Sequence, residues 1–87
     1  MNNPSFDVAP VTRVQVNNLL AQLTANGSTV KPGSTPDYWD IKGHKFFIEV
    51  EADARYDESL QILAVEVVHG PAGRVEAELR KQLGLPS

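Results

Sequence analysis

The two histidines, His44 and His69, are the side chains best suited to bind a metal or to exchange protons near neutral pH. Neither lies in an HxH or HExxH spacing, and the chain has no cysteine, so no zinc ligand set is recognisable. The strand register derived below sets His69 opposite Ile48, which places the two histidine backbones about 13 Å apart. We therefore predict no metal site, no cofactor and no catalytic residue.

Carboxylates form the second group with chemical potential, because they can attract a cation or a basic partner. Strand alternation collects on one sheet face Asp40, Glu49, Glu51, Asp53 and Glu66. The register sets Glu51 opposite Glu66, and like charges that face each other across strands are unfavourable. Metal-binding loops built from oxygen ligands have a tighter spacing, and the outer face of a two-layer domain is normally solvated. We therefore interpret these acids mainly as a solvent-facing surface.

Trp39 is a further candidate, because an indole ring can line a ligand pocket. A place in the hydrophobic core under the helices is the simpler explanation of its position. No serine lies in a GxSxG-type turn, and residues 31–35 lack the pattern of a phosphate-binding loop. The candidate binding residues are thus Trp39, His44, His69, Glu49, Glu51 and Glu66.

Length and composition limit the class of protein. With 87 residues, of which 41% are hydrophobic and 22% charged, the chain suits one small globular domain. A formal net charge of -3 argues against a nucleic-acid binder, which normally carries a basic patch. No apolar run approaches the roughly 20 residues that span a bilayer, and no signal peptide is recognisable. We expect an acidic, soluble, cytoplasmic protein that binds neither nucleic acid nor membrane.

A central stretch of alternating residues predicts a meander of three antiparallel strands. Gly43 and His44 suit a tight two-residue turn between the first two strands. The register that this turn imposes sets Trp39 opposite Ile48.

The second predicted turn runs through residues 57–60. Pairing across it sets Ala54 opposite Leu63 and Val50 opposite Val67, so that apolar residues again share one face. A one-residue slip would expose all of them, and the agreement of both hairpins therefore supports the assignment of faces. The predicted core contains Trp39, Ile41, Phe46, Ile48, Val50, Leu63, Val65 and Val67 from the sheet, with Leu20, Leu23, Val75 and Leu79 from helices.

Helices are predicted on both sides of the meander. The first begins near Thr12, whose side chain can cap free N–H groups, and ends at Asn26. The second follows Pro71, a residue suited to a first helical turn, and ends at Gly84. Helix, three strands and helix together predict an α+β two-layer sandwich, in which two helices cover one face of a three-stranded antiparallel meander.

The third strand, from Leu60 to Val68, is apolar and would lie at an edge of the meander. An apolar edge strand invites pairing with another chain. We expect a homodimer or an unknown protein partner there, with residues 1–11, an N-terminal arm, as the competing cover. Residues 12–87 would form the single domain.

These features favour a small non-catalytic binding or protein-interaction domain. Its working surfaces would be the edge of the third strand and the acidic sheet face. The alternative is a small ligand-binding or enzymatic domain with a pocket between helices and sheet, near Trp39 and His69. A buried polar or charged residue that faces such a pocket would favour the enzyme, and the sequence offers His69 alone.

Overall fold

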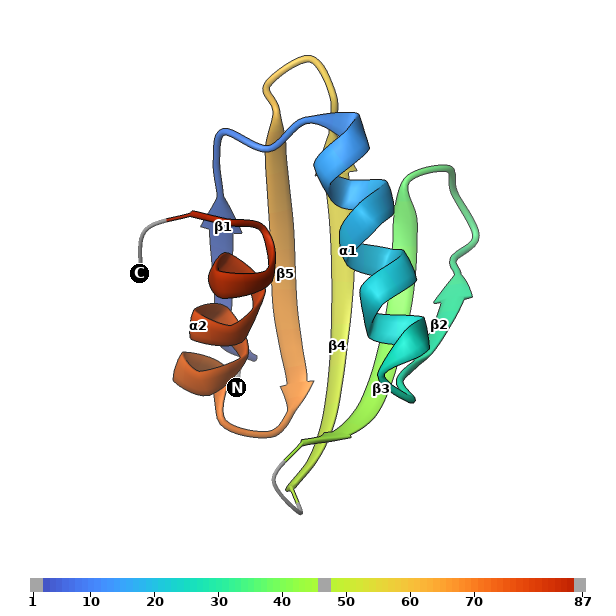
Figure 1. The fold of residues 1–87 in the computed structure, drawn as a ribbon, viewed down its shortest axis with the longest axis vertical. Helices are drawn as coiled ribbons and strands as arrows, with labels where there is room; N and C mark the ends of the chain where they lie inside the picture. The colour runs from blue at the N-terminus through green and yellow to red at the C-terminus, as the bar shows by residue number, and fades with distance from the viewer. Residues whose placement is uncertain (1–2, 46–47, 86–87) are drawn as a thin grey trace.

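The computed structural model describes residues 3–45 and 48–85, and of residues 44, 45 and 48 it describes the backbone alone. Its elements are β1 (Ser5–Val8), α1 (Arg13–Ala25), β2 (Thr29–Pro32), β3 (Tyr38–Lys45), β4 (Ile48–Asp57), β5 (Ile62–His69) and α2 (Ala72–Gln82). The strands form one antiparallel sheet in the order β1-β5-β4-β3-β2, and both helices cover the same face of it (Figure 1). The predicted α+β class is confirmed. The predicted meander corresponds to β3, β4 and β5, but the sheet has five strands rather than three, because β2 and β1 extend it at its two edges.

Helix α1 begins where the sequence predicts. The Thr12 hydroxyl accepts a hydrogen bond from the Gln15 backbone N–H at 3.2 Å, and the Gln15 side-chain oxygen accepts one from the Thr12 N–H at 2.8 Å. This reciprocal pair satisfies two N–H groups that have no partner within the helix. Asn26 caps the other end, and Gly27 follows with a φ of 96°.

Helix α2 also lies where predicted, after Pro71. Leu79 and Leu83 are buried against the sheet, and the half-buried Val75 packs beside them. Arg80, in the last turn, donates to Glu76 one helical turn earlier at 3.0 Å.

The first predicted hairpin has the wrong register. Trp39 pairs with Ala54 rather than Ile48, and the ladder continues to Lys45 and Ile48, past the predicted turn. Gly43 therefore lies inside a strand. A Cβ atom at Gly43 would stand 2.6 Å from the Ser28 hydroxyl oxygen, so a close approach of chains accounts for the glycine. The displacement is even, and the apolar faces stay as predicted. The predicted contribution of Phe46 and of the Ile48 side chain lies outside the described residues.

The second hairpin is also displaced by an even number of residues. Ala54 pairs with Val65, and Tyr56 takes the predicted place opposite Leu63. Asp57 closes the turn, since its carboxylate accepts hydrogen bonds from the Ser59 hydroxyl at 2.7 Å and the Leu60 N–H at 3.2 Å. The shift draws Tyr56, which the sequence analysis left out of the core, into a buried position with 4% exposure.

Strand β1 covers the edge of β5. Phe6 pairs with Val65 and Val8 with Leu63, and the Pro4 carbonyl accepts a further bond from the Val67 N–H at 2.8 Å. The N-terminal arm, rather than a second chain, therefore occupies the edge between Leu60 and Val68. The homodimer predicted there lacks the free edge on which it was based.

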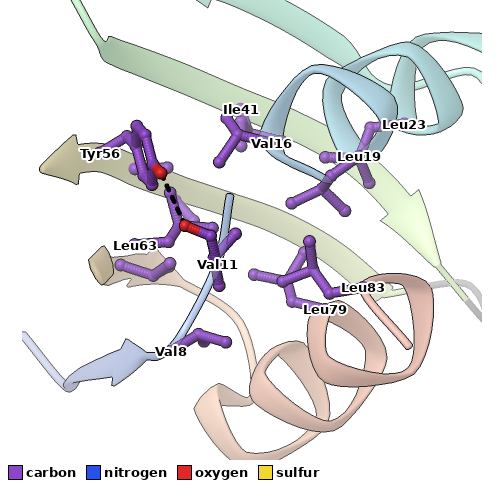
Figure 2. Packing of buried hydrophobic residues seen from close by; sticks show 13 residues of the cluster. Val8, Val11, Val16, Leu19, Leu23, Ile41, Tyr56, Leu63, Leu79 and Leu83 are labelled. Atoms are coloured by element: carbon purple, nitrogen blue, oxygen red, sulfur yellow. Dashed lines mark hydrogen bonds between the residues drawn. The ribbon is translucent and has the colours of Figure 1, made fainter. Parts of the chain in front are cut away.

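The core lies between the sheet and the helices (Figure 2). Most of the predicted core residues that the structure describes are buried, and Trp39, Val50, Leu20 and Val75 are half-buried. We call one group the closed end of the core: Val8, Val11, Val16, Tyr56 and Leu63, each at most 4% exposed.

Candidate functional site

A pocket of about 330 Å³ opens between α1 and α2, and the sheet forms its floor. Figure 1 shows α1 over β3 and β4 and α2 over β1 and β5, with the middle of the sheet between them. The lining is mainly apolar: Leu23 from α1, Val75 and Leu79 from α2, and Ile41, Val50, Ala52 and Val65 from the sheet. We call this region the open end of the core.

Small residues on the floor create the hollow. Gly43 and Ala52 lie on the helix-facing side of neighbouring strands, where a larger side chain would fill the space between the helices. A side chain at Gly43 would crowd Ser28, as described above. The pocket is thus a consequence of residue size at two positions rather than of an unusual backbone.

Polar side chains form the rim of the pocket. Arg74, Glu78, Lys81 and Gln82 come from α2, opposite Asn26 at the end of α1. The Gln82 side-chain N–H donates to a Glu78 carboxylate oxygen at 3.1 Å. The side-chain oxygen of Gln82 is buried and has no hydrogen-bond donor among the described residues.

The rim cations differ from three other cations of the chain that form ion pairs. Arg13, Lys42 and Arg80 each lie within 3.4 Å of a carboxylate oxygen. Arg74 and Lys81 are exposed, and neither forms an ion pair with a residue that the structure describes. The mouth of the pocket therefore carries two cations that the described part of the fold does not neutralise.

The other face of the sheet carries a row of three acids. Asp53 on β4 lies directly between Asp40 on β3 and Glu66 on β5. Partial burial, and then the charge of Asp40, raise the pKa of Asp53 above its ordinary value, and a hydrogen bond from Tyr38 opposes this. Burial and the nearby Asp53 also raise the pKa of Tyr38. This arrangement replaces the predicted pairing of Glu51 with Glu66.

These acids do not form a metal site in the part of the chain that the structure describes, where no group of three or more His, Cys, Asp or Glu side chains is suitably placed. Binding of a basic partner to this face stays a prediction.

The six predicted binding residues do not meet in one site. Trp39 packs half-buried against the core, while His69 is exposed at the end of β5. His44 pairs with Glu49 along the β3–β4 ladder.

The two other predicted glutamates have separate partners. Glu51 lies opposite His69 and 3.4 Å from the Lys42 ammonium, whereas Glu66 accepts a hydrogen bond from the Asn3 side chain at 3.0 Å. Of the six predicted residues, the five whose side chains the structure describes do not line the pocket between the helices. The alternative prediction named such a pocket, and the structure has one at a different position from the predicted Trp39 and His69.

Sequence reasoning missed the residues that form the pocket. The available signal was the run of small residues at alternate positions, Gly43 on one strand with Ala52 and Ala54 on the next. No helix among the described residues is long and apolar enough to cross a membrane. Comparison of the chain with protein-family models, curated proteins and solved structures finds no match.

Proposed function

We propose that this chain is a small non-catalytic binding domain and that the pocket between α1 and α2 is its binding site. The observation that carries the proposal is a concave apolar pocket of about 330 Å³ with a few polar groups at its mouth. Ligand pockets in proteins typically measure about 300–1,000 Å³ and share this distribution of apolar walls and sparse polar groups. The volume favours a small molecule rather than a peptide or a second domain.

The chemistry of the lining supports binding without catalysis. Ser28 is the only hydroxyl group among the lining residues that the structure describes, and no histidine or cysteine accompanies it. An activated nucleophile needs an adjacent base, and a general acid or base needs a positioned titratable group. Glu78, the one carboxylate among the lining residues that the structure describes, accepts a hydrogen bond from the Gln82 amide at 3.1 Å.

A neutral fluorescent probe, N-phenyl-1-naphthylamine, tests the proposal, because its emission rises in apolar surroundings. We expect saturable binding with one probe per chain. Ala52→Leu should abolish this binding, since the added side chain fills the floor of the pocket. Ala64→Leu is the matched control, because Ala64 lies on the other face of the sheet opposite Arg55.

Two outcomes would overturn the proposal. One is wild-type protein that shows no saturable binding of the probe. The other is Ala52→Leu protein that keeps native circular dichroism and binds the probe as tightly as wild type does.

A further inference from the structure

We infer that the pocket selects a small amphipathic carboxylate, with its apolar body on the pocket floor and its carboxylate at the rim beside Arg74 and Lys81. The inference rests on the proposed function, because it identifies the class of ligand for the same site. Its support comes from the placement of the two rim cations, from the electrostatics of α2 and from the shape of the pocket.

Arg74 and Lys81 lie on the same side of α2. They are seven residues apart, which is about two turns of an α-helix. Between them, Val75 and Leu79 face the interior of the pocket. A ligand whose apolar part contacts Val75 therefore has its outer end beside a row of two cations.

Arg74 occupies a position that the helix itself disfavours. It lies in the first turn of α2, which contains no acidic residue. The positive end of a helix dipole repels a cation there and attracts an anion. Arg13 also lies in a first turn, that of α1, but there Asp37 and Glu58 form ion pairs with it. A bound anion beside Arg74 would offset this unfavourable arrangement.

The net charge of the whole chain is opposite in sign to the charge of the two rim cations. A protein with a formal net charge of -3 repels small anions in general. At the rim, however, Arg74 and Lys81 outnumber Glu78, which already accepts a hydrogen bond from Gln82. The guanidinium fork of arginine matches a carboxylate with two parallel hydrogen bonds, which favours this head group. The pocket volume of about 330 Å³ limits the apolar body to a short one.

Isothermal titration with three probes tests the inference: octanoate, its neutral analogue octanol, and acetate, which has the head group alone. All are used below the concentration at which octanoate forms micelles. We expect wild-type protein to bind octanoate about tenfold more tightly than octanol, as a charge-assisted hydrogen bond implies. Acetate should not bind, because it has no apolar body.

Two variants locate the selectivity. Arg74→Gln combined with Lys81→Gln should reduce the preference for octanoate to about twofold or less while octanol binds as before. The control is Arg55→Gln, which removes a cation from the other face of the sheet and should keep the full preference. Arg74→Gln alone should weaken octanoate binding without lowering the melting temperature of the free protein, because Arg74 opposes the helix dipole.

The outcomes separate this inference from the proposed function. The inferred carboxylate selectivity would be wrong if wild type bound octanol and octanoate equally, or if the double variant kept the preference for octanoate. Either result would leave the proposed apolar binding site unaffected. Absence of binding by octanol, octanoate and N-phenyl-1-naphthylamine would overturn both. Octanoate binding that persists in Ala52→Leu would place the anion site elsewhere and contradict the inference.

Discussion

The two ends of the core are built from the same sheet and the same pair of helices, yet one is filled and the other is hollow. At the closed end, Val8, Val11 and Val16 are fully buried and Leu63 is 1% exposed. At the open end, a pocket of about 330 Å³ separates α1 from α2 above Ala52. The difference teaches that the inner face of this sheet supports both a packed core and a hollow, according to side-chain size.

Residue size along β4 accounts for much of the contrast. Its helix-facing side runs Val50, Ala52, Ala54 and Tyr56, so the bulk lies at the closed end. There the chain between β1 and α1 adds a second layer, because the Val11 N–H donates to the Gln61 carbonyl at 2.9 Å. At the open end, the small residues on the sheet are Ala52 on β4 and Gly43 on β3.

The Tyr56 hydroxyl donates to the Val11 carbonyl at 2.6 Å, as the dashed line in Figure 2 marks. This bond joins the segment before α1 to β4. The closed end is therefore held by polar contacts as well as by packing.

Truncation of a large side chain should show the greatest difference between the two ends. Leu63→Ala should destabilise the protein by about 2–5 kcal/mol, because it opens a cavity in a packed region. Val50→Ala should cost about 1 kcal/mol or less, since Val50 is half-buried and borders an existing hollow. Urea unfolding of both variants measures these costs. Equal losses would mean that the two ends are packed alike.

Enlargement of an alanine gives the second largest expected effect. Ala54 and Ala52 are both 3% exposed, but only Ala52 lines the pocket. Ala54→Leu should cost about 1–3 kcal/mol through overpacking, whereas Ala52→Leu should stay within about 1 kcal/mol of wild type. Thermal unfolding compares the pair directly. A larger loss for Ala52→Leu would show that the pocket has no room for a side chain.

Tyr56→Phe examines the hydrogen bond at the closed end without changing its packing. The variant keeps the ring, over which the Arg13 guanidinium lies at 5.1 Å. It leaves the Val11 carbonyl without this donor, so we expect a loss of about 1–2 kcal/mol in urea unfolding with an unchanged denaturant slope. If Tyr56→Phe were as stable as wild type, this hydrogen bond would not contribute to the stability of the closed end.

The sequence allowed prediction of which residues face the helices but not of which residues pair. Side-chain direction alternates with a period of two, so any even displacement of a strand preserves its faces. Trp39 thus lies on the predicted face although its partner is Ala54 rather than Ile48. The predicted register was wrong because it assumed a turn at Gly43. In the sequence, a glycine that permits close approach to Ser28 resembles one that permits a turn.

The predicted helices were correct because their signals are local. Thr12 and Gln15 form the capping box within a single turn, and Pro71 precedes α2. Strand β1 and the pocket depend instead on segments far apart in sequence. Val8 meets Leu63 only after the chain has formed the rest of the sheet. The hollow over Ala52 arises from missing bulk, and the small residues at alternate positions indicate it only once the strands are known to be neighbours.

The smallest expected effect concerns the ion pairs of the closed end. Arg13, in the first turn of α1, donates to Asp37 at 2.9 Å and to Glu58 at 2.7 Å, and so joins two loops. Its hydrogen bonds lower the pKa of Asp37 below its ordinary value. Because the folded-state pKa is depressed, this contribution to stability is complete above the unfolded-state pKa of about 3.9. It is lost as the pH falls through the folded-state value.

Asp37→Asn isolates that charge, because asparagine tolerates the φ of 62° at this position. We expect the variant to be less stable than wild type at neutral pH and equally stable once the pH lies below the folded-state pKa of Asp37. Urea unfolding across this range measures the convergence, and added salt should reduce the difference at neutral pH, since the pair is partly exposed. A stability difference between wild type and Asp37→Asn that stays constant with pH would show that Asp37 acts through hydrogen bonding and loop geometry. The stability of the closed end would then come from packing and from Tyr56 rather than from charge.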